Sequence, residues 1–308
     1  MSKTAFIFPG QGSQYPGMGK ELADTFSVAR HLFEEADDAL GFKLSALCFA
    51  GSEADLKLTA NTQPAILATS IAALKVAEQE AGLKANYVAG HSLGEYSALV
   101  CSGAFSFTDA VKTVRARGTF MQEAVPVGTG TMAAMLGIDR DVLEDICRDA
   151  AEGEVVSPAN FNSPGQIVIA GSVAAVARAI EIAKSRGFRK AMLLPVSAPF
   201  HCALMQPAAD RLAKVLDAVS ILDMAVPVFA NADAAPNSLK DRVKPLLVTQ
   251  VCSPVLWDQS VTAMAELGVT KFIEIGPGKV LSGLVKRITK DVEIANIEDC
   301  TGIKAIVA

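Results

Sequence analysis

A serine lies between two glycines at 90–94, in the segment Gly-His-Ser-Leu-Gly. The apolar stretch at 85–92 predicts a buried strand that runs into this motif, and the residues at 93–104 predict a helix after it. This is the context of a nucleophile elbow, where a tight turn lifts a serine hydroxyl out of a sheet and only small residues fit two positions before and after it. Ser92 is therefore the candidate nucleophile; a chance occurrence of the motif in a glycine-containing turn is the alternative. Backbone N–H groups at the start of the helix would stabilise an anion formed beside it.

A serine nucleophile needs a base, and the chain has three histidines. His91 is adjacent to Ser92, and adjacent side chains of extended backbone point to opposite faces. His31 lies in an acid-rich helical segment and is expected at the surface. His201 follows a predicted strand and precedes an amphipathic helix, a junction that lies at the carboxyl edge of a parallel sheet. We predict that His201 is the general base; a structural histidine is the alternative.

A hydrolase triad would also need an acid between Ser92 and His201 in chain order. Asp109 lies in the first turn of a predicted helix, where the helix dipole explains a carboxylate. The other aspartates considered fall together in one predicted helix: Asp139, Asp141, Asp145 and Asp149. The group that orients His201 is therefore expected to be uncharged, and a backbone carbonyl after the histidine would suffice.

The predicted helix at 107–125 carries an arginine on its inner face. Its apolar stripe consists of Val111, Val114, Met121 and Val125. At roughly 100° per residue, Arg117 lies about 60° from the centre of the stripe and Arg115 about 100°. A buried arginine needs an anionic partner, because its charge is costly to strip of water. A substrate carboxylate held by the planar guanidinium is the functional interpretation. A snorkelling side chain or an internal salt bridge is the alternative.

The remaining pattern predicts the organisation of the chain. Alternating strands and helices, among them a helix at 62–82 with Pro64 in its first turn, indicate an α/β fold with a mostly parallel sheet. The middle of the chain instead predicts strand 131–138, helix 139–153, strand 154–162, strand 166–171, helix 172–187 and strand 189–197. That order is typical of a ferredoxin-like unit. We predict a hydrolase-like domain formed by 1–127 and 198–308, with a ferredoxin-like subdomain at 128–197 inserted into it.

Composition excludes several classes of protein. The chain has 308 residues, 51% of them hydrophobic, which is enough for a sizeable core. A net charge of -5 argues against a nucleic-acid binder. Six cysteines without a CxxC pair suggest neither a zinc site nor a disulfide framework, and no segment reaches the roughly 18 apolar residues of a membrane span. We expect a cytoplasmic protein without a metal or a cofactor.

Six motifs are distributed along the whole chain. They are FPGQGSQ at 8–14, GHSLGEYSALV at 90–100, RARG at 115–118, NFNSPGQIVIAG at 160–171, FHCALM at 200–205 and EIGPGKVLSGLVKR at 274–287. In this order and spacing they closely resemble the malonyl-CoA:acyl carrier protein transacylase family of bacterial type II fatty acid synthesis. The family's fold, a hydrolase-like α/β domain with a ferredoxin-like insertion, agrees with the organisation predicted above.

The resemblance implies a ping-pong reaction. Ser92 would take malonyl from coenzyme A and give it to the phosphopantetheine thiol of the carrier protein, so the coenzyme A thioester is a substrate and the acceptor carries the phosphopantetheine. His201 would act as base and then acid, and Arg117 would hold the malonyl carboxylate.

The resemblance assigns further residues to the site. Gln11 and Leu93 would donate backbone N–H groups to the oxyanion, and the main-chain carbonyl of Gln250 would orient the histidine. Asn160 and Gln63 match positions that line the site. Phe200 together with Leu93 resembles the pattern that accompanies malonyl in related acyltransferases, although residues 198–201 read Ala-Pro-Phe-His and depart from a full His-Ala-Phe-His signature.

The implied partners are malonyl-CoA and an acidic acyl carrier protein, with no nucleic acid and no membrane. An acidic enzyme needs a local basic surface to meet an acidic partner. Candidates for it are Lys279, Lys286, Arg287, Lys290, Arg186, Arg189 and Lys190. We expect a monomer.

Two other functions would use the same elbow or fold. A serine hydrolase, such as an esterase or thioesterase, would use the same elbow but would not depend on Arg117 for the selection of a charged acyl group. A non-catalytic scaffold would be expected to have lost Ser92, Arg117 or His201, and all three are present.

Overall fold

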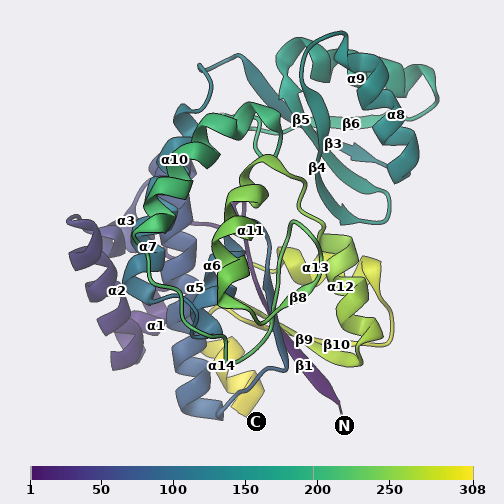
Figure 1. Ribbon diagram of the computed structural model, residues 1–308. Helices are drawn as coiled ribbons and strands as arrows, with labels where there is room; N and C mark the ends of the chain where they lie inside the picture. Colours follow the sequence, from purple (N-terminus) through teal and green to yellow (C-terminus); the bar gives the residue numbers. More distant parts are fainter. Residues whose placement is uncertain (1, 197, 308) are drawn as a thin grey trace.

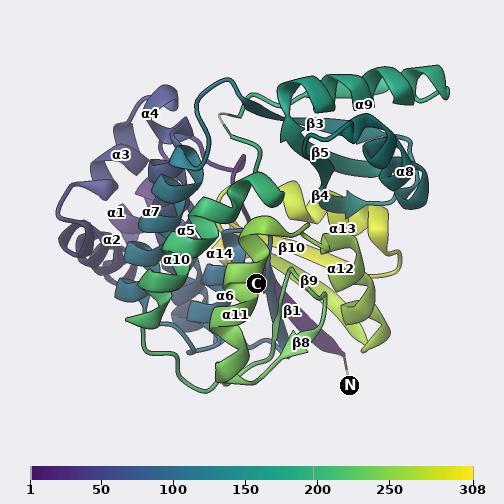
Figure 2. The same ribbon diagram turned by 45° about the horizontal axis from the view of Figure 1, so that its top comes forward.

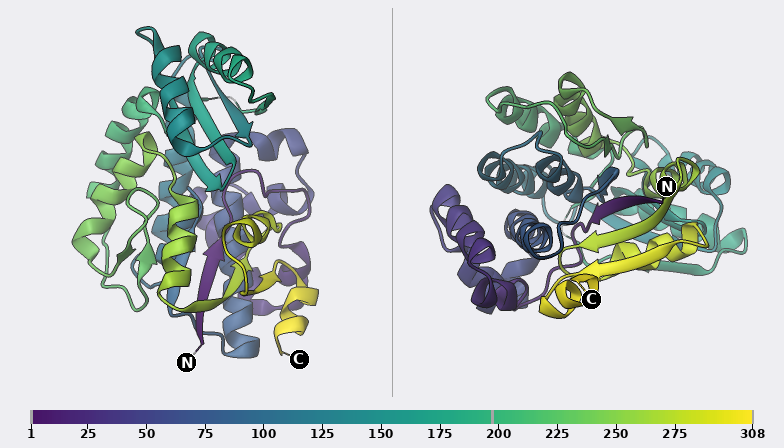
Figure 3. Two further views of the ribbon diagram at one scale, coloured as in Figure 1. Left: turned by 90° about the vertical axis from the view of Figure 1, so that its right-hand side faces the viewer. Right: turned by 90° about the horizontal axis from the view of Figure 1, so that it is seen from below.

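The computed structural model describes residues 2–196 and 198–307, in which the larger sheet has the order β10-β9-β1-β2-β7-β8. The strands are β1 (Lys3–Phe8), β2 (Tyr87–Gly90), β7 (Val228–Phe229), β8 (Pro236–Asn237), β9 (Val269–Ile275) and β10 (Glu293–Ile297). Neighbouring strands are parallel, apart from the antiparallel pair of β7 and β8. Figure 3 shows β1, β9 and β10 side by side. The mostly parallel sheet predicted from the sequence is confirmed.

Helices cover both faces of this sheet (Figure 1). One face carries α1 (Lys20–Thr25), α2 (Ser27–Leu40), α3 (Leu44–Ala50), α4 (Glu53–Lys57), α5 (Thr59–Ala81), α6 (Gly94–Cys101), α7 (Phe107–Glu123), α10 (Gln206–Asp217), α11 (Lys240–Cys252) and α14 (Cys300–Val307). The other carries α12 (Trp257–Glu266) and α13 (Val280–Ile288). In β1, Phe6 and Phe8 enter the first core, whereas Ala5 and Ile7 enter the second. Burial on both faces explains why this strand reads as a continuous apolar run.

The long helix α5 begins earlier than the sequence indicated. The prediction placed Pro64 in the first turn of a helix at 62–82, but the helix starts at Thr59 and Pro64 lies inside it. The extra turn forms because the N–H groups of Asn61 and Thr62 both donate to the carbonyl of Leu58. In the part of the chain that the structure describes, no helix is both long enough and apolar enough to cross a membrane.

The middle of the chain forms a second, antiparallel sheet with the order β4-β5-β3-β6. Its strands are β3 (Gly130–Leu136), β4 (Val156–Ser163), β5 (Gln166–Ser172) and β6 (Lys190–Leu193), and α8 (Arg140–Ala151) and α9 (Val173–Ser185) cover one face (Figure 2). The last strand was predicted at 189–197 and is shorter, because pairing with β3 ends at Leu193; Ser197 lies outside the described residues.

The free face of the small sheet packs against the larger body. Met132 and Val168 belong to the core of the larger body, whereas Ala133 and Ile169 belong to the core under α8 and α9. Two backbone hydrogen bonds of 2.9 Å also join β4 to Val255. The small sheet therefore covers one end of the larger sheet, and both chain termini lie at the opposite end of the molecule (Figure 1).

Candidate active site

The turn between β2 and α6 brings three backbone segments into close contact. Ser92 lies at its tip with φ of 52°, in the left-handed region. A Cβ atom on Gly90 would lie 2.0 Å from the backbone of Gly94, and one on Gly94 would lie 2.2 Å from the carbonyl oxygen of Phe8. The prediction that only small residues fit at both positions is confirmed, and an added Cβ atom alone would already be too close. The glycines let the turn tighten enough to project the serine side chain beyond the strand ends.

Ser92 and His201 lie within hydrogen-bonding distance, although 109 residues separate them in sequence. Ser92 Oγ is 2.8 Å from His201 Nε2. His201 Nδ1 is 2.8 Å from the backbone oxygen of Gln250. Since a carbonyl oxygen only accepts, Nδ1 carries the proton and the lone pair on Nε2 faces the serine hydroxyl. His201 is thus arranged to accept the proton of Ser92.

The environment keeps His201 neutral. Its side chain is buried, with 4% of the residue exposed. Burial, with the positive charge of Arg117, lowers the pKa of His201 to about 3. An imidazole with so low a pKa is unprotonated at neutral pH, which is the state required of a general base.

Arg117 on α7 faces inward, as its position on the helix predicted, and is 1% exposed. One terminal nitrogen donates to Oε1 of Gln63 at 2.8 Å. The other donates to Oε1 of Gln250 at 2.8 Å and to Ser92 Oγ at 3.0 Å. In the described residues no carboxylate oxygen lies within 4.0 Å of it, so neither the snorkelling nor the salt-bridge alternative holds there. A buried positive charge without a direct salt bridge therefore adjoins the nucleophile, and the side chain of Gln250 separates it from Glu95.

Two backbone N–H groups near Ser92 are unoccupied. Gln11 lies in the turn after β1, and Leu93 immediately follows the serine. Within the described segments, neither N–H donates a hydrogen bond to another group. Free donors beside a nucleophile can stabilise negative charge that develops on a substrate oxygen.

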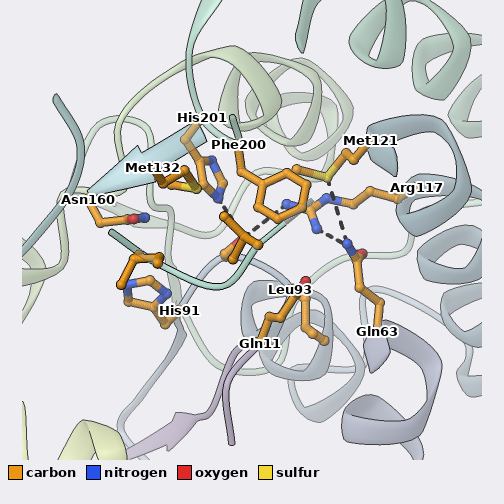
Figure 4. A pocket seen from close by; sticks show the side chains of 13 residues that line it. Gln11, Gln63, His91, Leu93, Arg117, Met121, Met132, Asn160, Phe200 and His201 are labelled. Atoms are coloured by element: carbon orange, nitrogen blue, oxygen red, sulfur yellow. Dashed lines mark hydrogen bonds between the residues drawn. The ribbon is translucent and has the colours of Figure 1, made fainter. Parts of the chain in front are cut away.

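These side chains enclose a cavity of about 110 Å³. Figure 4 shows Gln63 and Arg117 at one side and His91 and Asn160 at the other. The residues that line it are Gln11, Gln63, His91, Ser92, Leu93, Arg117, Met121, Met132, Asn160, Leu194, Val196, Phe200 and His201. The site residues predicted from the sequence are thus brought together, and Gln250 lies behind Arg117 and His201. Met132 and Asn160 come from β3 and β4, so both sheets contribute to the cavity.

His91 contacts residues other than the nucleophile. Its Nε2 lies 2.9 Å from Oδ1 of Asn162, and its ring packs at 5.8 Å from that of Trp257. In the part of the chain that is described, no hydrogen bond joins its ring to Ser92. Burial also lowers its pKa. The ring of His91 thus lines the cavity but is hydrogen-bonded to Asn162 rather than to the nucleophile.

Two buried residues behind the site were missed by reasoning from the sequence. Glu95 on α6 accepts hydrogen bonds at Oε2 from the backbone N–H of Asn231, at 2.9 Å, and from Nε2 of Gln250, at 2.8 Å. Burial raises the pKa of Glu95 to about 7. Asn231 in turn contacts the backbone around Ser92. Asn231 ends an apolar run at 226–230, the strand-end signal that also pointed to His201, and this signal could have identified it.

Comparison with known proteins agrees with the fold. Residues 5–304 match the acyl transferase domain family. The chain therefore belongs to the acyl transferase family.

Individual relatives identify a narrower class within the acyl transferase family. The malonyl CoA-acyl carrier protein transacylase of Bacillus subtilis is 52% identical over 300 residues, which cover 97% of this chain and 94% of the relative. The structure of an acyl carrier protein S-malonyltransferase from Vibrio cholerae has a TM-score of 0.96 and 49% identity, covering 99% of this chain and 100% of that one. A malonyl-transacylase in complex with its type II PKS acyl-carrier protein has a TM-score of 0.96 and 45% identity, covering 99% of both chains. The chain lies among the malonyl CoA-acyl carrier protein transacylases, as its motifs indicated.

Proposed function

We propose that this enzyme transfers a malonyl group from malonyl-CoA to the phosphopantetheine thiol of an acyl carrier protein, through a malonyl ester on Ser92. The observation that carries the proposal is the buried charge of Arg117, which lies 3.0 Å from the serine hydroxyl and, among the described residues, has no carboxylate within 4.0 Å. A general serine hydrolase has no need of such a charge. The names of the relatives, which act on malonyl-CoA and carrier protein, support the same substrate pair.

In the first half-reaction, Nε2 of His201 takes the proton of Ser92 as the oxygen attacks the thioester carbonyl. The negative charge that develops on the carbonyl oxygen is stabilised by the backbone N–H groups of Gln11 and Leu93. The C–S bond then breaks, and the proton on His201 passes to the departing thiol of coenzyme A. General-base catalysis of this kind contributes roughly 10²–10⁴-fold, and one oxyanion donor about 10²–10³-fold.

The carboxylate of the acyl group meets Arg117. Its terminal N–H groups bind two amide oxygens in the free enzyme, from Gln63 and Gln250. These neutral acceptors hold the guanidinium plane without cancelling its charge, so the charge remains available for a bidentate contact with the carboxylate. Phe200 and the methionine side chains close the rest of the cavity against the acyl chain. An unbranched dicarboxylic acyl group fits a cavity that has a positive charge at one side and apolar side chains around the rest.

In the second half-reaction, the thiol of phosphopantetheine replaces coenzyme A. His201 Nε2 takes the thiol proton, the sulfur attacks the ester carbonyl, and the proton passes to Ser92 as its oxygen leaves. No group outside the chain and its two substrates is required.

Several finer features belong to the same proposal. The small sheet has the order β4-β5-β3-β6, and along the chain α8 follows β3 and α9 follows β5. This arrangement supports a ferredoxin-like subdomain at 128–197, inserted into a hydrolase-like domain. Six cysteines are free in the described residues, which suits the cytoplasm. We expect a monomer that meets its acidic carrier through exposed basic residues such as Lys286 and Arg287 at the end of α13.

Intact-mass measurement after incubation with malonyl-CoA tests the function. The wild type should gain one malonyl group on Ser92, the Ser92→Ala variant should gain none, and adding carrier protein should move the group to its thiol. Arg117→Ala should lose its preference for malonyl-CoA over acetyl-CoA. Rapid loss of the malonyl group to water, with no transfer to the thiol, would establish a hydrolase instead.

A further inference from the structure

Ser92 has a backbone conformation that something outside its own turn must hold. Its φ of 52° places a residue with a side chain in the left-handed region. Such a conformation costs on the order of 1–3 kcal/mol and persists only where the surrounding structure fixes it. The position of the serine hydroxyl depends directly on this angle. The groups that hold the turn therefore determine whether the hydroxyl reaches His201.

The side chain of Asn231 bridges this turn. Its Oδ1 accepts a hydrogen bond from the backbone N–H of Ser92 at 2.7 Å. Its Nδ2 donates to the carbonyl oxygen of Gly90, also at 2.7 Å. Asn231 is 1% exposed, so water does not compete effectively for either bond. A single amide thus binds the backbone on both sides of His91.

The two bonds require one acceptor and one donor on the same short side chain. Asparagine supplies both, whereas an ionised aspartate only accepts and would turn a lone pair toward the carbonyl of Gly90. An alanine would leave the N–H of Ser92 and the carbonyl of Gly90 without these partners. The chemistry of the site therefore selects an amide at position 231.

Asn231 is itself fixed to the rest of the site. Its backbone N–H donates to Oε2 of Glu95, the same oxygen that accepts from the side chain of Gln250. The backbone oxygen of Gln250 binds His201. The carboxylate of Glu95 therefore connects the serine turn, through Asn231, with His201, through Gln250. These bonds limit how far the serine and the histidine can move relative to each other.

We propose that Asn231 is a positioning residue for the nucleophile: it holds the turn so that Ser92 Oγ lies against His201 and the N–H of Leu93 is left as the elbow's free oxyanion donor. Asn231 is not among the residues that line the cavity, so it acts on the reaction through the turn. The inference rests on the proposed role of Ser92 as nucleophile but not on the identity of the acyl group, because it concerns the reactivity of the serine toward any electrophile.

The test uses a neutral fluorophosphonate, which needs no carboxylate contact. Ser92 Oγ forms a bond to phosphorus, the phosphorus–fluorine bond breaks, fluoride leaves and the serine proton passes to His201. Asn231→Ala is expected to slow this reaction by about 10–100-fold, since a misplacement of about 1 Å can cost 10²-fold. With malonyl-CoA, kcat should fall by a similar factor while KM changes less than about threefold.

Asn237→Ala is the matched control. Asn237 is also buried, and its side chain also accepts from one backbone N–H and donates to one backbone carbonyl, both of Leu239 and away from the cavity. This variant should react like the wild type. A folded Asn231→Ala protein that reacts within about threefold of the wild-type rate overturns the proposal, and so does an equal loss in Asn237→Ala.

If the alanine variant does not fold, Asn231→Asp tests the positioning role of Asn231 instead. Its ionised carboxylate keeps the acceptor for Ser92 but loses the donor to Gly90, so its rate relative to wild type should be low at pH 8 and should rise toward pH 5.5, where the carboxyl can protonate and donate. A wild-type rate at pH 8 overturns the proposal. If the wild type reacts with the fluorophosphonate but transfers no malonyl, the proposed function fails while these variants still test Asn231. No reaction of the wild type overturns both.

Discussion

His201 Nδ1 donates to the backbone oxygen of Gln250 over 2.8 Å, at the position where the triads of serine hydrolases place a carboxylate. A carbonyl fixes the imidazole tautomer as a carboxylate would, but it adds no negative charge. The pKa of His201 is therefore not raised by an anionic neighbour, and burial lowers it to about 3. In the sequence, none of the acids considered between Ser92 and His201 was suited to orient the histidine, and this contact with a carbonyl oxygen takes that role.

Substitution of Gln250 should separate the role of its backbone from the roles of its side chain. Gln250→Ala keeps the backbone carbonyl that orients His201 but removes the side-chain oxygen that binds Arg117. It also removes the amide nitrogen that donates to the backbone oxygen of Ser92 and to Glu95, so some loss of serine reactivity is expected as well. We expect kcat/KM for malonyl-CoA to fall by about 10–100-fold, in line with the roughly 1–3 kcal/mol cost of an unsatisfied buried polar group. Fluorophosphonate labelling of Ser92 should fall by less than this. Equal losses in the two reactions would place the side chain in nucleophile activation.

The two histidines near the serine should differ in their effect. His201→Ala removes the base and is expected to lower the rate of Ser92 acylation by roughly 10²–10⁴-fold. His91→Ala removes contacts with Asn162 and Trp257 and should leave acylation measurable, within about tenfold of wild type. Stopped-flow or quench-flow acylation by malonyl-CoA measures both. Equal losses would refute the choice of His201 as base.

The pH dependence of acylation follows from the low pKa of His201. Its folded-state pKa lies near 3, below the usual 6.5, so the base stays neutral down to about pH 4. We expect kcat/KM for malonyl-CoA to stay nearly constant from pH 7.5 to pH 5. The measurement is best repeated in Glu95→Gln, which removes a carboxyl that titrates near pH 7. A decline with a midpoint between pH 6 and 7 in that variant would contradict the assignment.

The free energy of unfolding should depend on pH through the buried carboxyl of Glu95. Its pKa is raised from 4.5 to about 7, so between these values the folded state binds more protons than the unfolded state, and stability decreases as pH rises through this window. Glu95→Gln keeps an oxygen for the two donors and removes the titration. The free energy of unfolding of the variant minus that of wild type should therefore increase from pH 4.5 to pH 8, by a few kcal/mol. Urea denaturation at both pH values tests this, and a constant difference would contradict it.

Two glycine substitutions should have opposite effects. Gly94→Ala brings a Cβ atom to 2.2 Å from the carbonyl oxygen of Phe8, so it should destabilise the fold and disturb the serine turn. Gly283, inside α13, has nothing within 4 Å of an added Cβ. Gly283→Ala should be neutral or stabilising by up to about 1 kcal/mol, as expected for a helix interior. Thermal unfolding and Ser92 labelling of both variants provide the comparison.

Local patterns in the sequence were sufficient for residues whose role depends on their own element. The spacing of glycines around Ser92 predicted the turn, and the helical period of α7 predicted the burial of Arg117. The predicted start of α5 was wrong. The first hydrogen bonds of the helix are accepted by the carbonyl of Leu58, which lies before the apolar segment used for the prediction.

Pairings between distant elements were harder to predict. Asn231 binds Ser92 across 139 residues, and Gln250 binds Glu95 across 155. No periodicity links such positions, because the contacts exist only once β2 and β7 lie side by side in the sheet. The buried polar network behind the site therefore became visible only in three dimensions.

The distribution of the site along the chain also has a consequence for synthesis. Ser92 and Arg117 leave the ribosome long before His201, Asn231 and Gln250, and the central strand β1 gains its second neighbour only when β9, residues 269–275, has been made. A nascent chain thus carries a serine without its base. Because contacts between residues this far apart form late in folding, we expect the hydroxyl to stay unreactive toward thioesters until nearly the entire polypeptide has been completed.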